Sequence, residues 1–157
     1  MARIQSDRKT LDLLSWQPTS PRVERFEEQT VRAATISGKV SLAVSRILGD
    51  AKSRDKEPLE REDVARRMSD FLGEDVSKNM IDAYASQSRE DHKISVVRAV
   101  ALMHATQDYR LLTLLAEELG LTVIPRKYEG TVREAILAEK IEELNGELHS
   151  LRRGRKS

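Results

Sequence analysis

The chain has 157 residues, of which 39% are hydrophobic, 4% aromatic and 34% charged, and its formal net charge is +1. This length fits one domain with extensions better than two full domains, and the composition is typical of a helical protein with an aliphatic core. The absence of cysteine excludes a disulfide scaffold, a thiolate zinc site and a cysteine nucleophile. With no apolar run long enough to span a bilayer and a polar N-terminus, we expect a soluble intracellular protein.

The sequence pattern divides the chain into three parts. Residues 1–38 carry Pro18 and Pro21 and form an N-terminal arm that is either loose or includes one short helix. Residues 39–120 carry regularly spaced apolar side chains and form the main domain, and residues 121–157 add a connector, a helix and a basic tail. The pattern predicts an all-α fold with five helices in its main domain.

The first three predicted helices are defined by apolar spacing and by residues that favour helix ends. The first begins at Lys39, and the second covers residues 59–72 and ends at Gly73 in a left-handed turn. Ser77 is a favourable N-cap for the third helix, residues 77–87. The loop between the second and third helices is short and contains a glycine, which is typical of a helix-turn-helix, although an ordinary helical hairpin has the same pattern.

The last two helices of the main domain follow a polar loop. The fourth covers residues 94–106, and Asp108 caps a fifth that Gly120 closes. Residues 121–125 are either a short strand or an extended connector. Within the fourth helix we expect these side chains to be largely buried: Val96, Val97, Val100, Ala101 and Met103.

No catalytic pattern is present in the sequence. It lacks a phosphate-binding loop, a zinc-protease helix motif and a nucleophile elbow. The three histidines, His92, His104 and His149, are far apart in the chain. We therefore expect no enzyme activity, metal, cofactor or small-molecule ligand.

The third helix has an unusual polar face for so charged a chain. If Val76, Met80, Ile81 and Tyr84 face inward, Ala83 and six short or amide-bearing polar residues face outward. Such side chains suit the major groove of DNA, where amides pair with adenine and lysine reaches guanine or phosphate. Asp82 either accepts from a cytosine amino group or orients Lys78. The candidate base contacts are Ser77, Lys78, Asn79, Asp82, Ser86 and Gln87. Of these, Ser77 is first of all a helix cap.

Basic residues on both sides of the third helix are candidate phosphate contacts, which position a protein without reading sequence. Further basic residues near both chain ends serve either nonspecific DNA affinity or solubility. The candidate phosphate contacts are Arg61, Arg66, Arg67, Arg89 and Lys93, and the residues near the ends are Arg3, Arg8, Lys9, Arg152, Arg153, Arg155 and Lys156.

The C-terminal helix carries a heptad seam, with apolar residues alternately four and three positions apart and charged residues around them. Such a helix is marginal alone, so it either pairs with a second chain or packs on its own domain. The seam residues, which are the candidate oligomerisation contacts, are Leu137, Ile141, Leu144, Leu148 and Leu151.

Residues 39–120 resemble the λ-repressor-like DNA-binding fold. The segments DLLSWQP, DVARRMSDFLGEDVSKNMIDAY and SREDHKISVVRAVALMHAT, with the charged helical tail, resemble the small DNA-binding regulators of Mu-like transposable bacteriophages. The resemblance implies a recognition helix at Ser77–Gln87 and a supporting helix at Glu60–Leu72. This chain departs from general repressors in the position of Gly73, which makes the supporting helix about one turn longer.

These observations predict a non-enzymatic, sequence-specific protein that binds double-stranded DNA as a homo-oligomer. The resemblance implies a phage regulator of transcription or transposition in the cytoplasm of a bacterial host cell. The alternative is a helical adaptor that binds a protein of the recombination or replication machinery. It would use the C-terminal seam or the N-terminal DLLSW segment.

Overall fold

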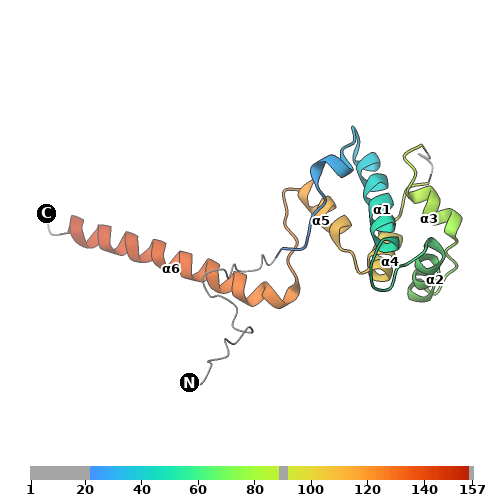
Figure 1. Ribbon diagram of the computed structural model, residues 1–157. Coiled ribbons are helices and arrows are strands. Elements are labelled where there is room, and N and C mark those ends of the chain that lie inside the picture. The colour runs from blue at the N-terminus through green and yellow to red at the C-terminus, as the bar shows by residue number, and fades with distance from the viewer. Residues whose placement is uncertain (1–21, 89–91, 156–157) are drawn as a thin grey trace, which may run out of the picture.

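The computed structural model describes residues 22–88 and 92–155, and within them the chain is all-helical (Figure 1). Helices α1 to α5 form a body from which α6 extends as a single long rod. The predicted all-α fold, with five helices followed by a C-terminal helix, is confirmed. The elements in chain order are η1 (Glu28–Val31), α1 (Ile36–Lys52), α2 (Arg61–Leu72), α3 (Lys78–Tyr84), α4 (Val96–Thr106), α5 (Arg110–Glu117), η2 (Arg126–Tyr128) and α6 (Glu129–Gly154).

Helix α1 begins before the predicted start at Lys39. The Thr35 hydroxyl accepts a hydrogen bond from the Gly38 backbone N–H at 3.0 Å, which caps the first turn. The apolar residues ahead of this cap also belong to the body, because Phe26 and Val31 are buried in the core. The guanidinium of Arg110 lies 4.5 Å from the centre of the Phe26 ring, a cation–π contact that joins this segment to α5.

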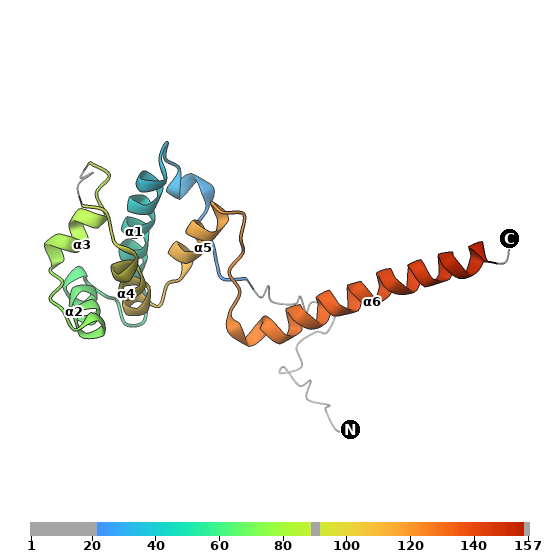
Figure 2. The ribbon, with the colours of Figure 1, turned by 180° about the vertical axis from the view of Figure 1, so that it is seen from behind.

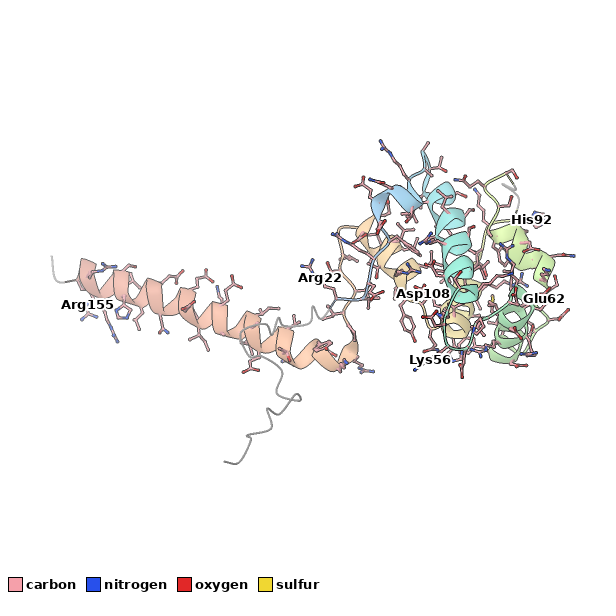
Figure 3. All side chains as sticks on the ribbon, in the orientation of Figure 1. Arg22, Lys56, Glu62, His92, Asp108 and Arg155 are labelled. Carbon is pink, nitrogen blue, oxygen red and sulfur yellow. The ribbon has the colours of Figure 1, made fainter. Side chains whose placement is uncertain are left out.

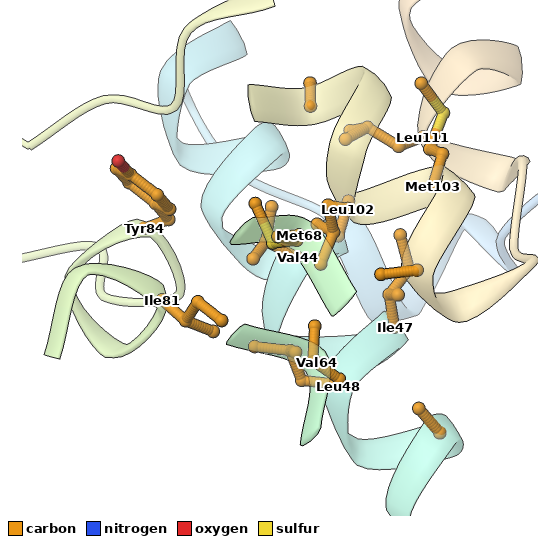
Figure 4. Close-up of a cluster of buried hydrophobic side chains, with 14 of the residues drawn as sticks. Val44, Ile47, Leu48, Val64, Met68, Ile81, Tyr84, Leu102, Met103 and Leu111 are labelled. Carbon is orange, nitrogen blue, oxygen red and sulfur yellow. The ribbon is translucent and has the colours of Figure 1, made fainter. Parts of the chain in front are cut away.

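The core consists mainly of aliphatic side chains from all five helices of the body, with a few residues from the connecting segments (Figure 4). Helix α4 packs against α2 over the most extensive helix–helix contact and also touches α1. The most completely buried large apolar side chains come from α1, α2, α3, α4 and α5: Val44, Ile47, Val64, Met68, Ile81, Leu102 and Leu111.

The expected burial of α4 is wrong at three of its five positions. Ala101 and Met103 are buried, but Val96, Val97 and Val100 are 79%, 63% and 45% exposed. An apolar run indicates a buried helix, yet α1 and α2 cover only one side of α4. The three valines lie on the other side, which no described residue covers.

The segment after α5 is an extended connector and not a strand. Among the described residues, one backbone hydrogen bond joins it to the N-terminal segment, from the Val23 N–H to the Val123 carbonyl at 3.1 Å. Helix α6 then leaves the body, and seen from behind it again points away from the other helices (Figure 2). No residue of α6 is buried, so none of the described residues of this chain covers the α6 seam.

Gly73 ends α2 as predicted, whereas the N-cap of α5 is Tyr109, one residue after the predicted Asp108. Gly73 ends α2 with a φ of +68°, and its N–H donates to the Ser69 carbonyl at 2.8 Å. Asp108 precedes α5, and its carboxylate accepts from the Arg110 backbone N–H at 3.1 Å. The Arg110 guanidinium also pairs with the Asp50 carboxylate of α1, with Nη2 2.8 Å from Oδ2, so the same arginine links α5 to α1.

Replacing Gly73 by alanine should destabilise the protein by about 1 kcal/mol, because an L side chain is strained at this positive φ. Gly49 provides a matched control, since it lies within α1 and a Cβ there would meet no atom within 4 Å. Gly49→Ala should stabilise by about 0.5–1 kcal/mol through helix propensity. Urea unfolding followed by circular dichroism measures both, and equal effects of the two substitutions would contradict the assigned role of Gly73.

Candidate nucleic-acid interface

The turn between α2 and α3 is held by one serine side chain. The Ser69 Oγ accepts from the Val76 N–H at 2.9 Å and donates to the Ala65 carbonyl at 2.9 Å. Val76 and Ile81 are both buried on the two sides of the α3 start, as a hydrophobic staple requires. These contacts fix the direction in which α3 leaves the turn. The sequence pattern did not single out Ser69, although a serine four residues before the terminating Gly73 was a visible signal.

Helix α3 begins as predicted and ends earlier. The Ser77 hydroxyl accepts from the Met80 N–H at 3.3 Å, so Ser77 is the N-cap. The helix ends at Tyr84, and Ser86 and Gln87 lie beyond it, so the predicted helix at 77–87 is wrong over its last residues. Beyond the helix end, Ser86 Oγ lies 3.0 Å from Ser88 Oγ.

The exposed face of α3 is smaller than the helical pattern indicated. Ser77, Lys78 and Asn79 are exposed, and Gln87 is exposed beyond the helix. Ala83, which was predicted to face outward, is 2% exposed. Its burial follows from contacts of α3 with both α1 and α2, which cover two sides of a short helix. The open surface of α3 is therefore concentrated in its first turn.

Ion pairs between α2 and α3 occupy most of the charged groups of this surface. The carboxylate of Asp82, which is half-buried, accepts from the Arg61 guanidinium, so its hydrogen-bond partner is Arg61 and not Lys78. Lys78 donates from Nζ to Glu62 at 2.6 Å. Each cation beside α3 thus has an acidic neighbour, and the two pairs add no net positive charge.

The pair of Lys78 and Glu62 remains ionised at neutral pH. The hydrogen bond from Lys78 lowers the pKa of the Glu62 carboxyl below its ordinary value. The same hydrogen bond raises the pKa of the Lys78 ammonium. Both shifts favour the charged forms, so the ammonium of Lys78 is attracted toward α2 whenever no stronger anion is near.

The structure distributes the candidate phosphate contacts over different parts of the body. Arg66 is exposed and pairs with Asp63 at 2.8 Å. Arg67 points toward α4 and donates to the Ala105 carbonyl at 3.4 Å, away from the ion pairs of α3. Lys93 is exposed ahead of α4, and Arg89 lies outside the described residues.

The end of α3 is fixed by an arginine that the sequence pattern did not indicate as functional. Arg98 of α4 donates to the Tyr84 hydroxyl, and it reaches the Glu74 carboxylate at 3.2 Å. The Tyr84 hydrogen bond, aided by Glu74, raises the pKa of the guanidinium. In the sequence, Arg98 could have been singled out as the one cation within the apolar run VVRAVALMHA. Arg98 ties α4 both to the turn and to the last residue of α3, so it positions the exposed first turn.

Charged side chains cover the whole length of the molecule (Figure 3). Glu62 marks the end of the body where α2 and α3 meet, while Arg155 lies at the far end of α6. The described residues contain no group of three or more acidic, histidine or cysteine side chains suited to a metal ion. None of the helices in the described ranges combines the length and apolar character needed to cross a membrane.

The fold and this surface define an all-helical protein with a short, exposed, polar helix start held on two packed helices. In comparisons with known proteins, the model of the family described as phage regulatory protein CII (CP76) matches residues 74–150. The matched region starts in the turn before α3 and runs through most of α6. The match supports a phage regulator, whereas the resemblance to Mu-like phages stays a prediction. No curated protein and no solved structure matches the chain significantly.

Proposed function

We propose that this chain is a non-enzymatic, sequence-specific DNA-binding regulator of a phage, acting on transcription or transposition. The observation that carries the proposal is the exposed first turn of α3, where Lys78 and Asn79 stand on a helix held by α2 and α4. The major groove of DNA accommodates a helix presented in this way. The family match to a phage regulatory protein supports the same function.

Asn79 is the residue best suited to read a base. It is exposed, and its side-chain amide makes no hydrogen bond within the described part of the chain. An asparagine amide pairs with the two hydrogen-bonding atoms of an adenine edge. The Ser77 hydroxyl already caps α3 but retains its own proton for a further acceptor. Gln87 and Ser86 would reach the DNA from the loop after α3 and not from the helix.

Acidic neighbours make the body a weak DNA-binding unit by itself. Glu62, Asp82 and Asp63 offset Lys78, Arg61 and Arg66, so attraction to phosphates depends on Lys93 and the basic residues near the chain ends. Arg3, Arg8, Lys9 and Lys156 among these lie outside the described residues. Two bodies joined together bind DNA far more tightly than one, because the second contact is intramolecular.

We infer that α6 joins two chains through its seam. All five seam residues are between 44% and 67% exposed. In heptad terms Ile141 and Leu148 occupy a positions, with leucine at each d position. The β-branched Ile141 between leucines at d favours two parallel strands, whereas Leu148 gives no such preference. A parallel pair also brings Glu147 opposite Arg152 of the second chain, at the g and e positions that form interchain ion pairs. Two α3 helices would then address half-sites about 34 Å or a multiple apart.

Selection of bound sequences from a random duplex pool tests the proposed function. The full-length chain should enrich a recurring motif with two half-sites at a fixed spacing. The low net charge of the α2–α3 surface and the exposed α6 seam favour the alternative, a helical adaptor that binds another protein. Absence of binding at both low and moderate salt would support the adaptor and reject the DNA-binding proposal.

Asn79→Ala should cost about 1–3 kcal/mol of binding on the selected sequence, because one base-edge pair is lost. Binding to random DNA of the same length is the internal control and should change little. Gel-shift titration of both duplexes at one salt concentration measures the difference. An equal loss on both duplexes would remove Asn79 from base reading.

Glu62→Gln should strengthen binding to every DNA sequence, because it frees the Lys78 ammonium for a phosphate. The plot of log binding constant against log salt should steepen by up to about 0.9 for one additional phosphate contact. Glu28→Gln is the matched control, since Glu28 is an exposed glutamate on η1, on the side of α1 away from α3 (Figure 1). If both variants change the salt slope equally, only overall charge is involved.

Leu144→Glu should dissociate chains that α6 joins, because it places a carboxylate in the centre of the seam. Ile136→Glu is the matched control on the same helix, since Ile136 is 60% exposed and lies off the seam. Sedimentation equilibrium of the full chain should show a lower average mass for Leu144→Glu alone. Equal masses for the two variants would show that the seam does not join chains.

A further inference from the structure

The outer side of α4 is an apolar surface without charge. Val96, Val97, Val100 and His104 fall within about 100° of one another around the helix axis. All four are exposed. Arg98 is the one lysine, arginine or acidic residue of α4, and it points to Tyr84. In a chain with 34% charged residues, an uncharged exposed helix side indicates a contact surface.

This surface, which we name the valine face, continues onto α2. The Phe71 ring is 45% exposed and stacks on His104 with ring centres 4.3 Å apart and an interplanar angle of 25°. Next to the two rings lies a hollow of about 410 Å³. It is lined by Arg67, Asp70, Phe71, His104, Ala105 and Gln107.

The two ends of the valine face are complementary in shape and charge. At the start of α4, Val96 and Val97 protrude, and the exposed Lys93 precedes them. At the other end lies the hollow, and Asp70 is exposed on its wall. Lys93 and Asp70 form no ion pair with any described residue. The hollow also carries Arg67, which donates to the Ala105 carbonyl, so the carboxylate left for a partner is that of Asp70. A protruding end with an unpaired cation and a hollow end with an unpaired carboxylate suit a two-fold contact between identical chains.

We propose that the valine face binds the valine face of a second copy of this chain, with the two α4 helices antiparallel and Val100 at the two-fold axis. Val97 and His104 lie on opposite sides of Val100 along the helix. In the antiparallel pair, Val97 of one copy therefore packs against His104 and Phe71 of the second copy. Lys93 approaches Asp70 of the second copy at both edges. The proposal does not depend on DNA binding and concerns a surface separate from the α6 seam.

The α6 helix of another chain fits this surface less well than a second valine face does. The residues that flank its seam at the e and g positions are of both signs, Lys140, Glu147 and Arg152, and Glu147 would meet the Asp70 carboxylate at the hollow. Like charges at a desolvated contact are unfavourable. An isologous contact instead buries the same valines twice and pairs each Lys93 with an acid.

Single cysteines test the contact directly, because the chain contains none. Val100→Cys in the full chain should give a covalent dimer on mild oxidation, since two copies of this position meet at the axis. Leu112→Cys is the control, at 43% exposure on α5 compared with 45% for Val100. Cross-linking of Val100→Cys no faster than of Leu112→Cys would overturn the proposal.

Charge exchange tests the antiparallel arrangement. Val100→Glu and Lys93→Asp should each lower the average mass in sedimentation equilibrium, and adding Asp70→Lys to Lys93→Asp should restore it. All of these positions are exposed, and circular dichroism should show unchanged folding.

If Val100→Glu leaves the mass unchanged, the face serves another partner or none, and the second-copy proposal is wrong. Failure of the double exchange to restore the mass would reject the antiparallel arrangement. No measurement here uses DNA, so its outcome is separate from that of the proposed function.

Discussion

The exposed first turn of α3 depends on the turn that joins α2 to α3. Gly73 ends α2 in a left-handed conformation, and Ser69 then satisfies the Val76 N–H that the turn leaves without a helical partner. Arg98 holds the other end of α3 through Tyr84. With both ends fixed, α1 and α2 cover its remaining sides and leave Lys78 and Asn79 in solvent. Any DNA-reading role of α3 depends on the contacts of Ser69, Gly73 and Arg98 that fix its two ends.

Charge cancellation on the α2–α3 surface has a consequence for the proposed DNA binding. A binding surface rich in unpaired lysine and arginine would hold any DNA sequence, because phosphate attraction is independent of sequence. Here Glu62 and Asp82 offset Lys78 and Arg61, so a single body gains little from phosphates. Base contacts and joined copies would then contribute a larger share of the binding free energy, which favours discrimination between sites over strong general binding.

Two apolar surfaces of the chain are left uncovered by its described residues, and they differ in kind. The α6 seam is a regular heptad on a helix that leaves the body, with charged residues around it. The valine face belongs to the body and combines aliphatic side chains with a neighbouring hollow. The seam proposed to join chains lies at a distance from α3, whereas the valine face lies on the helix that positions α3 through Arg98. Contact at the valine face therefore bears more directly on α3.

The sequence by itself determined the all-α fold, the α2 end at Gly73, the Ser77 cap and the α6 seam, because these depend on local backbone preferences and helical spacing. It did not determine which sides of the helices other elements cover. Val96, Val97 and Val100 therefore proved exposed, and Ala83 buried. The ion partners of Lys78 and Asp82, and the turn of Arg67 toward α4, were likewise decided by tertiary structure. Local spacing defines the apolar side of a helix, but burial and ion pairing depend on how distant helices cross.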